Sequence, residues 1–303
     1  MRALVTGATG FVGGKLVEAL SERGTAVRCL VRDRSRAGAL ERAGHELHEG
    51  DVLDPPSLIG AAREVDVAYY LIHSMGRGGD AGFAERERAA ARAFAGMARD
   101  AGVERVVYLG GLGEKPSSEH LRSRQETAEI LAREGPPLTY FRAAMVVGAG
   151  SDSYRTLRHL VQRLPAMIAP AWLETATQPI GVEDVIAYLG EAPDVPASAG
   201  REVQIGGPDV LTYGEMLDRM SGALGRRPAP RVPVPFISPR LSSLWIGLVT
   251  PVDAGVARPL VEGLSTETVV TDRSGAALFD VDPAPFDETL RLALAEERAT
   301  AAA

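Results

Sequence analysis

The segment Thr6-Gly7-Ala8-Thr9-Gly10-Phe11-Val12-Gly13-Gly14 constrains the fold of this chain more than any other feature. It follows a short apolar run at 2–6 and precedes a stretch, 11–21, whose apolar residues recur at helical spacing. A strand, a tight glycine turn and a helix in this order form the context that a dinucleotide-binding fingerprint requires. The G-x-x-G-x-x-G spacing therefore predicts a Rossmann-type unit at the start of the chain.

The segments that follow alternate between strand-like and helix-like patterns. Largely apolar runs at 26–31, 66–72, 105–109 and 137–142 suit strands that are covered on both faces, and a further short strand is expected at 46–49. Helical patterns at 82–101 and 119–133 separate the later runs. This alternation predicts an α/β fold, a doubly wound parallel sheet with right-handed crossovers.

The pattern changes after residue 150. We expect helices at 151–164, 184–189, 213–224 and 286–297, strands at 177–180 and 202–205, and a proline-rich connector at 228–239. Residues 1–150 should form an NAD(P)-binding Rossmann domain with returning elements around 174–206, and residues 151–303 a smaller mixed α/β substrate lobe with C-terminal helices. The apolar segment 241–249 is interpreted as a buried helix, with an interaction or membrane-surface element as the alternative.

Composition excludes several classes of protein. The net charge of −7 over 303 residues argues against a general nucleic-acid binder, which needs a basic surface. The single Cys29 can form no internal disulfide and no thiolate zinc site, so we expect no metal centre. No apolar run is long enough to span a bilayer, and the first strand leaves no room for a signal peptide. We therefore expect a cytoplasmic protein without a transmembrane segment.

The glycine segment assigns the first cofactor contacts. Gly7 permits the tight turn, Gly10 lets the backbone approach a pyrophosphate, and Gly13 lets the helix pack closely on the strand. The pyrophosphate would lie at the N-terminus of the first helix, where backbone N–H groups are unpaired. We predict cofactor contacts from six residues of this segment: Gly7, Thr9, Gly10, Phe11, Val12 and Gly13.

Residues after the next three strands extend this cofactor prediction. Arg32 follows the second strand, about 20 residues after the glycines, where an Arg accommodates the 2′-phosphate of NADP. Arg32 therefore favours NADP(H). Because the acidic Asp33 comes next and could bind the ribose hydroxyls instead, NAD(H) stays the alternative. Asp51, followed by Val52, could accept a hydrogen bond from the adenine amino group or cap the next helix. His73 ends the fourth strand and could touch the ribose or have a structural role.

The motifs together resemble the short-chain dehydrogenase/reductase superfamily. The chain is similar to its atypical, extended branch, which contains NmrA-like proteins and the NADPH-binding accessory subunit of respiratory complex I. The resemblance is carried by the glycine segment, Arg32, Asp51, the run 108–113, the helix from His120, the stretch 177–185 and Gly206-Gly207-Pro208. It covers nearly the whole chain and implies a Rossmann fold that binds NAD(P).

The same resemblance exposes three departures from the catalytic pattern of active members. These carry a Ser or Thr after the fifth strand and Tyr-x-x-x-Lys on the next helix. Here Gly110 and Gly111 stand where the Ser would be, and the best match to the second motif is His120 with Arg124. His120 could exchange a proton and Arg124 could hold ribose hydroxyls, although a neighbouring guanidinium disfavours protonated His120. The alternative is a polar helix face without a catalytic role, while Gly110 leaves room for a cofactor ring.

The second half supplies apolar residues that suit a lipophilic ligand such as a quinone or isoprenoid-like molecule, or else ordinary core packing. The polar candidates for substrate contacts are Ser74, Arg142, Tyr154 and Gln178. We therefore expect an NADP(H)-dependent oxidoreductase that acts on a small lipophilic carbonyl or quinone. The alternative is a non-catalytic NADP(H)-binding redox sensor or assembly factor with a protein partner.

Overall fold

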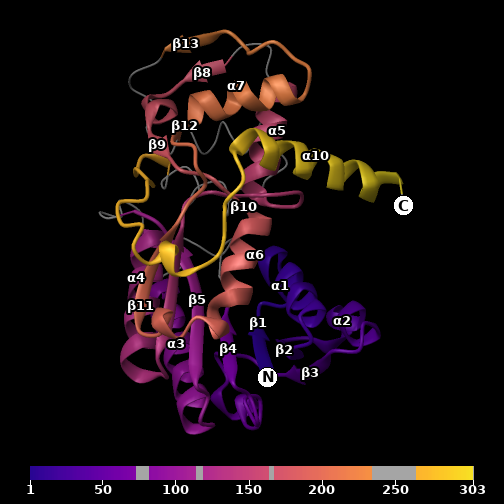
Figure 1. The fold of residues 1–303 in the computed structure, drawn as a ribbon, viewed down its shortest axis with the longest axis vertical. Coiled ribbons are helices and arrows are strands. Elements are labelled where there is room, and N and C mark those ends of the chain that lie inside the picture. Colours follow the sequence, from indigo (N-terminus) through magenta and orange to yellow (C-terminus); the bar gives the residue numbers. More distant parts are fainter. Residues whose placement is uncertain (73–81, 114–118, 164–166, 234–263, 303) are drawn as a thin grey trace.

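A parallel sheet of seven strands organises the fold, with six strands from the first half of the chain and one, at 201–205, from the second (Figure 1). The computed structural model describes residues 1–72, 82–113, 119–163, 167–233 and 264–302. In sheet order the strands are β11 (Arg201–Ile205), β6 (Leu138–Ala143), β5 (Arg105–Gly111), β4 (Val67–Tyr70), β1 (Arg2–Thr6), β2 (Ala26–Val31) and β3 (Glu46–Glu49). Neighbouring strands are parallel throughout. The predicted doubly wound Rossmann-type fold is confirmed.

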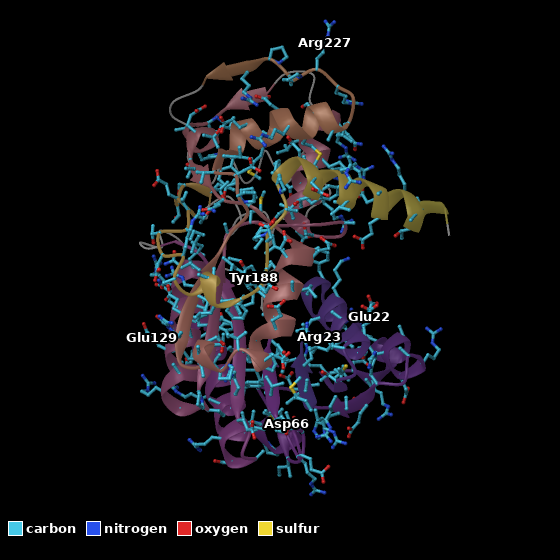
Figure 2. All side chains as sticks on the ribbon, in the orientation of Figure 1. Glu22, Arg23, Asp66, Glu129, Tyr188 and Arg227 are labelled. Atoms are coloured by element: carbon cyan, nitrogen blue, oxygen red, sulfur yellow. The ribbon has the colours of Figure 1, made fainter. Side chains whose placement is uncertain are left out.

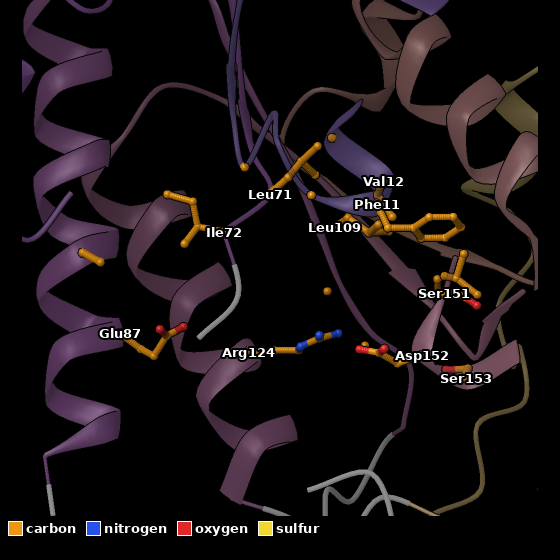
Figure 3. Close-up of a pocket in the computed structure, with 18 of the residues that line it drawn as sticks. Phe11, Val12, Leu71, Ile72, Glu87, Leu109, Arg124, Ser151, Asp152 and Ser153 are labelled. Carbon is orange, nitrogen blue, oxygen red and sulfur yellow. The ribbon is translucent and has the colours of Figure 1, made fainter. Parts of the chain in front are cut away.

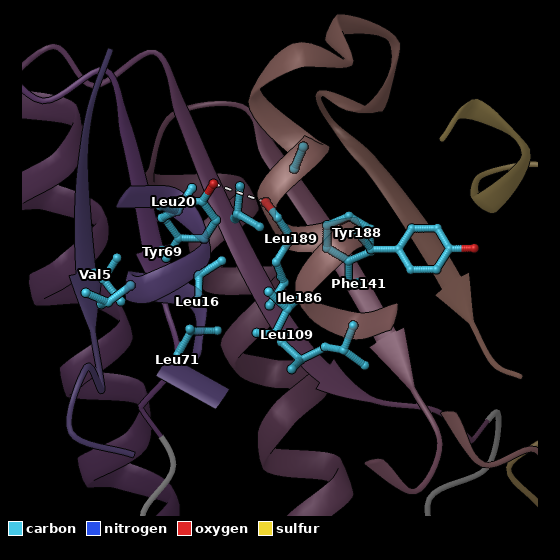
Figure 4. Close-up of a cluster of buried hydrophobic side chains, with 14 of the residues drawn as sticks. Val5, Leu16, Leu20, Tyr69, Leu71, Leu109, Phe141, Ile186, Tyr188 and Leu189 are labelled. Carbon is cyan, nitrogen blue, oxygen red and sulfur yellow. Dashed lines mark hydrogen bonds between the residues drawn. The ribbon is translucent and has the colours of Figure 1, made fainter. Parts of the chain in front are cut away.

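Helices cover both faces of this sheet. On one face lie α1 (Phe11–Glu22) and α6 (Val182–Glu191), and on the other α3 (Phe83–Asp100) and α4 (Glu119–Glu134). Because successive strand residues point to opposite faces, β4 sends Tyr69 toward α1 and α6, and Tyr70 toward α3. The Tyr69 hydroxyl donates to the Leu189 carbonyl at 3.1 Å, which ties the sheet to α6 (Figure 4).

The order of the strands determines where a ligand can bind. The chain runs outward from β1 through β2 to β3, then returns to β4 on the other side of β1. In open α/β sheets, ligands bind at the carboxyl ends of the strands beside such a reversal. The turn that carries Gly7 leaves β1 at this edge, next to Leu71 after β4.

The second half forms a lobe around its own apolar core. Helices α5 (Asp152–Arg163), α7 (Tyr213–Ala223) and α10 (Phe286–Ala302) surround it. Short strands pair within the lobe: β7 (Val146–Val147) with β10 (Ile180–Gly181), β9 (Ala176–Thr177) with β12 (Leu211–Thr212), and β8 (Met167–Ala169) with β13 (Arg231–Pro233). The single strand predicted at 177–180 is wrong, because β9 and β10 pair with different partners on either side of Gln178.

The remaining elements are short, and part of the sequence is not described. They comprise α2 (Gly38–Arg42) and the 3-10 turns η1 (Arg34–Ala37), η2 (Pro55–Leu58), η3 (Ala171–Glu174), η4 (Ala192–Asp194), η5 (Pro196–Ser198) and η6 (Ala276–Leu278). The apolar segment 241–249 lies outside the described residues. Within the described ranges, no helix combines the length and apolarity needed to cross a membrane.

Ion pairs connect the two halves at their surface. Lys15 on α1 contacts Glu296 on α10 at 2.9 Å and Glu183 on α6 at 3.5 Å. Arg23, after α1, contacts Asp194 at 2.7 Å. These groups are partly exposed, so each pair contributes at most about 1 kcal/mol. Other charged side chains, such as Glu22, Glu129 and Arg227, lie at the periphery (Figure 2).

Asp184 on α6 gives the fold a testable pH dependence. Its carboxylate accepts the Ala284 amide at 3.1 Å, and burial together with Glu183 and Asp282 raises its pKa to about 6. Because the folded pKa exceeds the unfolded one, this group favours folding at low pH, and that contribution is lost between about pH 4 and pH 6. We expect the free energy of unfolding of the wild type, relative to Asp184→Asn, to fall by about 3 kcal/mol over this range. Urea denaturation at several pH values measures it, with exposed Asp280→Asn as the control; a constant difference would contradict the assignment.

Candidate functional site

One cavity of about 720 Å³ lies along the carboxyl ends of the strands. The ends of β1, β2, β3, β4, β5 and β6 all contribute residues to its lining, for example Gly7, Arg32, Asp51, Leu71 and Gly110. The cavity continues into the lobe, where Met145, Asp152, Tyr213, Leu264 and Thr268 line it. A single space therefore joins the glycine turn to the second half of the chain.

The glycine turn is shaped by backbone contacts that only glycine allows. Gly7 has a φ of +68°, and a Cβ there would lie 2.5 Å from the Leu71 carbonyl oxygen. A Cβ on Gly13 would lie 2.1 Å from the Gly7 oxygen, so this glycine lets α1 pack against the turn. Gly10 is the N-cap of α1 without a side-chain hydrogen bond, and the first turn of the helix holds no acidic residue. Its N–H groups therefore suit the phosphates of a dinucleotide.

The edge of β2 supplies a positive group to the cavity. Arg32 lines the cavity, is exposed and forms no ion pair with any described residue. Asp33 does not line the cavity. Its carboxylate accepts hydrogen bonds from the Ser35 hydroxyl and, at 2.9 Å, from the Ser35 amide, and these two bonds lower the pKa of Asp33. Of the two residues that the sequence left competing for the ribose, only Arg32 faces the cavity.

The end of β3 adds the adenine candidates. Asp51 and Val52 both line the cavity. One oxygen of the Asp51 carboxylate accepts the Leu53 amide at 2.9 Å, which orients the side chain. The N-cap position of η2 is Asp54, which forms no side-chain capping bond, so Asp51 is not the N-cap residue of this turn.

The end of β5 is crowded at the two glycines where the resemblance described above implies a Ser in active members. A Cβ on Gly110 would lie 2.7 Å from the ring of Tyr140, and a Cβ on Gly111 would lie 2.7 Å from Leu121. The ring of Tyr140 stacks on Tyr108 with centroids 5.3 Å apart, so it has little freedom to move. Backbone alone therefore faces the cavity at Gly110 and Gly111.

Arg124 extends from α4 into the cavity, between Glu87 of α3 and Asp152 at the start of α5 (Figure 3). Its Nε is buried and has no hydrogen-bond partner among the described residues. Its Nη1 would lie 3.6 Å from a Cβ on Gly111, which places the guanidinium beside the end of β5. The group can hold an oxygen of a bound molecule, although it cannot donate a proton.

Three residues predicted to bind substrate lie outside the cavity lining. Arg142 donates to the carbonyls of Gly111 and Gly113 at 3.2 and 2.6 Å and pairs with Glu202 at 2.7 Å. Tyr154 donates to Glu297 at 2.8 Å, and Gln178 donates to the Gly207 carbonyl at 2.6 Å. Because their polar groups are satisfied within the protein, this geometry does not favour substrate roles, which stay predictions.

The remaining predicted residues cannot be placed in the same way. His73 and Ser74 lie outside the described residues, and His120 lies on α4 with a side chain that is not described. Their suggested roles stay predictions. No group of His, Cys, Asp and Glu in the described part of the chain could hold a metal ion.

The cavity lining contains residues from α3 and from the lobe that the sequence motifs do not predict. Tyr213, Thr268, Glu87 and Asp152 line the cavity, although no motif marked them. The only sequence signal near Tyr213 is the capping box formed by Thr212 and Glu215, which predicts a helix start but not its place in the fold. Thr268 is held at the cavity by an isolated β-bridge to Thr177, a residue far from it in the sequence.

Comparisons with known proteins agree with this geometry. A family model described as NAD(P)H-binding matches residues 7–144. The chain is similar to the mitochondrial NADH dehydrogenase (ubiquinone) 1 alpha subcomplex subunit 9 of Arabidopsis thaliana, with 26% identity over 90% of this chain and 71% of that protein. It is also similar to the ceramide reductase of Caulobacter vibrioides, with 27% identity over 77% of this chain and 74% of the reductase.

The fold is also found among solved structures. Triphenylmethane reductase from Citrobacter sp., in complex with NADP(H), superposes with a TM-score of 0.77 at 19% identity. The alignment covers 96% of this chain and 99% of that reductase. Residues 7–144 thus match an NAD(P)H-binding family, and the chain as a whole shares the fold of this NADP(H)-bound reductase.

Proposed function

We propose that the protein is an NADP(H)-dependent reductase of a small lipophilic carbonyl or quinone. The observation that carries the proposal is the continuous cavity, which starts at the glycine turn and ends between apolar residues of the lobe. A bound nicotinamide cofactor would supply a hydride; the protein would hold the cofactor and the acceptor together and limit access of water. In this proposal Gly7, Gly10 and Gly13 make room for the pyrophosphate at the start of α1.

Arg32 is proposed to select NADP(H). Its guanidinium faces the cavity without an ion pair among the described residues, whereas the Asp33 carboxylate is bonded to Ser35. A 2′-phosphate can accept charge-assisted hydrogen bonds from a guanidinium. Asp51 would accept a hydrogen bond from the adenine at the neighbouring strand end.

Arg124 is proposed to hold the nicotinamide ribose or an acceptor oxygen. The charge lies beside Gly111, and its Nε lacks a partner among the described residues. His120 stays a candidate for proton exchange. A quinone suits such a site because the reduced oxygen can take its proton from water.

The second candidate function is a non-catalytic NADP(H)-binding sensor or assembly factor. Tyr140 and Leu121 crowd the positions where a Ser would serve catalysis, and one relative is named as a subunit of an NADH dehydrogenase (ubiquinone). An assay separates the two functions: purified protein with NADPH and a panel of quinones and enones. Under the reductase proposal at least one acceptor causes NADPH consumption; tight NADPH binding without consumption across the panel favours the sensor.

Gly10→Ala tests the proposed pyrophosphate site. A Cβ there would lie 3.1 Å from the Gly7 oxygen and would stand in the cavity where the phosphates approach. We expect the Kd values for NADPH and NADH to rise together by about tenfold or more, since roughly 1.4 kcal/mol of contact is lost. Gly14→Ala is the matched control, because its Cβ would make an ordinary 3.5 Å contact outside the cavity lining. Fluorescence titration measures both; unchanged affinity in Gly10→Ala would contradict the site.

Arg32→Gln tests cofactor choice. Losing charge-assisted hydrogen bonds to a 2′-phosphate should raise the Kd for NADPH about 10- to 100-fold and leave the Kd for NADH nearly unchanged. Arg36→Gln, an exposed arginine on η1 outside the cavity lining, should alter neither. If the wild type binds NADH more tightly than NADPH, the assignment to NADP(H) is wrong.

A further inference from the structure

A cluster of three hydroxyl groups lies in the lobe wall of the cavity. Thr177 and Thr268 contact each other at 2.7 Å between their Oγ1 atoms, and both act on the nearby hydroxyl of Tyr213, whose pKa they lower. Tyr213 and Thr268 line the cavity, whereas Thr177 is fully buried behind them. Exposed fractions of 7% for Tyr213 and 9% for Thr268 show that both are deeply placed.

The cluster is held rigidly from several sides. The Thr268 amide donates to the Ala176 carbonyl at 3.1 Å, and the Thr268 carbonyl accepts the Gln178 amide at 2.9 Å. Tyr213 begins α7 directly after the N-cap residue Thr212, and its ring contacts Trp172 edge-on with centroids 6.1 Å apart. Rigid support of this kind fixes hydroxyl groups in position before a ligand arrives.

The segment that carries Thr268 packs against the glycine end of β5. A Cβ on Gly113 would lie 3.1 Å from the Cγ2 of Thr266, two residues before Thr268. The hydroxyl cluster and the end of β5 therefore belong to adjoining walls of one cavity. The lobe side of this cavity also contains the apolar Met145 and Leu264 and, at the start of α5, the polar Ser151, Asp152 and Ser153.

We infer that Tyr213 and Thr268 bind the oxygen atom of the hydride acceptor, supplying from the lobe the hydroxyl groups that β5 and α4 do not supply. This inference rests on the proposed reductase function. Bound NADPH would supply the hydride and become NADP⁺. In a carbonyl acceptor the hydride adds to carbon, the C=O electron pair moves to the oxygen held by O–H donors of the cluster, and a proton from water completes the alcohol. In a quinone the hydride adds to one oxygen, the electron pair passes through the ring to the other oxygen, which the cluster holds, and a proton from water completes the hydroquinone.

The chemistry of the cluster suits a donor role. Three hydroxyl groups offer three O–H donors and twice as many lone pairs, so one O–H can turn to a ligand while the cluster stays connected. Burial raises the pKa of Tyr213 to about 12, an effect that the neighbouring Thr177 and Thr268 partly offset. Tyr213 therefore stays protonated at physiological pH and enters the contact as a donor.

The test uses a quinone and a hydrocarbon of the same shape. Calorimetric titration of the NADP⁺-loaded protein compares 2,3-dimethyl-1,4-naphthoquinone with 2,3-dimethylnaphthalene, and NADPH consumption gives kcat and KM for the quinone. In Tyr213→Phe and Thr268→Val we expect the Kd for the quinone to rise about 5- to 10-fold, with little change for the hydrocarbon. KM should rise and kcat fall, while the Kd for NADPH stays constant.

Tyr188→Phe is the matched control, because Tyr188 packs on Phe141 and Phe279 away from the cavity.

Equal quinone affinity in wild type, Tyr213→Phe and Thr268→Val overturns the inference and leaves the reductase proposal standing. A wild type that binds NADPH but neither binds nor reduces the quinone also overturns it. Loss of hydrocarbon affinity together with quinone affinity would mean that the substitutions damage the cavity itself, and this also counts against a hydrogen-bonding role. Failure of the wild type to bind NADPH overturns the proposed function first.

Discussion

The close approach of Gly13 to the carbonyl of Gly7 is the constraint on which the site depends. A Cβ at Gly13 would stand 2.1 Å from that oxygen, so any other residue would push α1 away from the end of β1. Because α1 starts here, its first N–H groups open onto the cavity at the reversal of strand order. The same helix carries Lys15, which pairs with α6 and α10. Displacing α1 would therefore disturb both the cofactor end of the cavity and the contact with the lobe.

The Rossmann half could be predicted from the sequence because its signals are local. Apolar runs, helical spacing and the glycine turn identify strands, helices and the cavity edge without any knowledge of distant contacts. Arg32 and Asp51 were identified for the same reason, since the residues that follow parallel strands meet at one edge. Arg142 also follows this rule in position. However, its guanidinium donates to two backbone carbonyls and pairs with Glu202, and these contacts could not be predicted from the sequence.

The lobe wall could not be predicted, because it is assembled from contacts between segments far apart in the chain. Thr177 meets Thr268 only when the segment after residue 264 returns to β9, and Tyr213 joins them through α7. The crowding of Gly110 by Tyr140 is equally hidden, since it arises from the register between β5 and β6. Local patterns predict that a helix or strand exists, but they do not predict which side chains from distant segments share a cavity.

The cofactor end of the cavity and its lobe wall lie in different parts of the chain, and this bears on how similar proteins come to differ in activity. The NAD(P)H-binding family model ends at residue 144, so it covers the glycine turn, Arg32, Asp51 and Arg124 but none of the hydroxyl cluster. Proteins similar to this chain have names as different as an NADH dehydrogenase (ubiquinone) subunit and a ceramide reductase. If the acceptor is held by Tyr213 and Thr268, acceptor choice resides in a region that can change without disturbing the cofactor turn. In that case replacing the lobe residues should alter the acceptor while NADPH affinity stays constant, because the contacts that shape the turn lie on other elements.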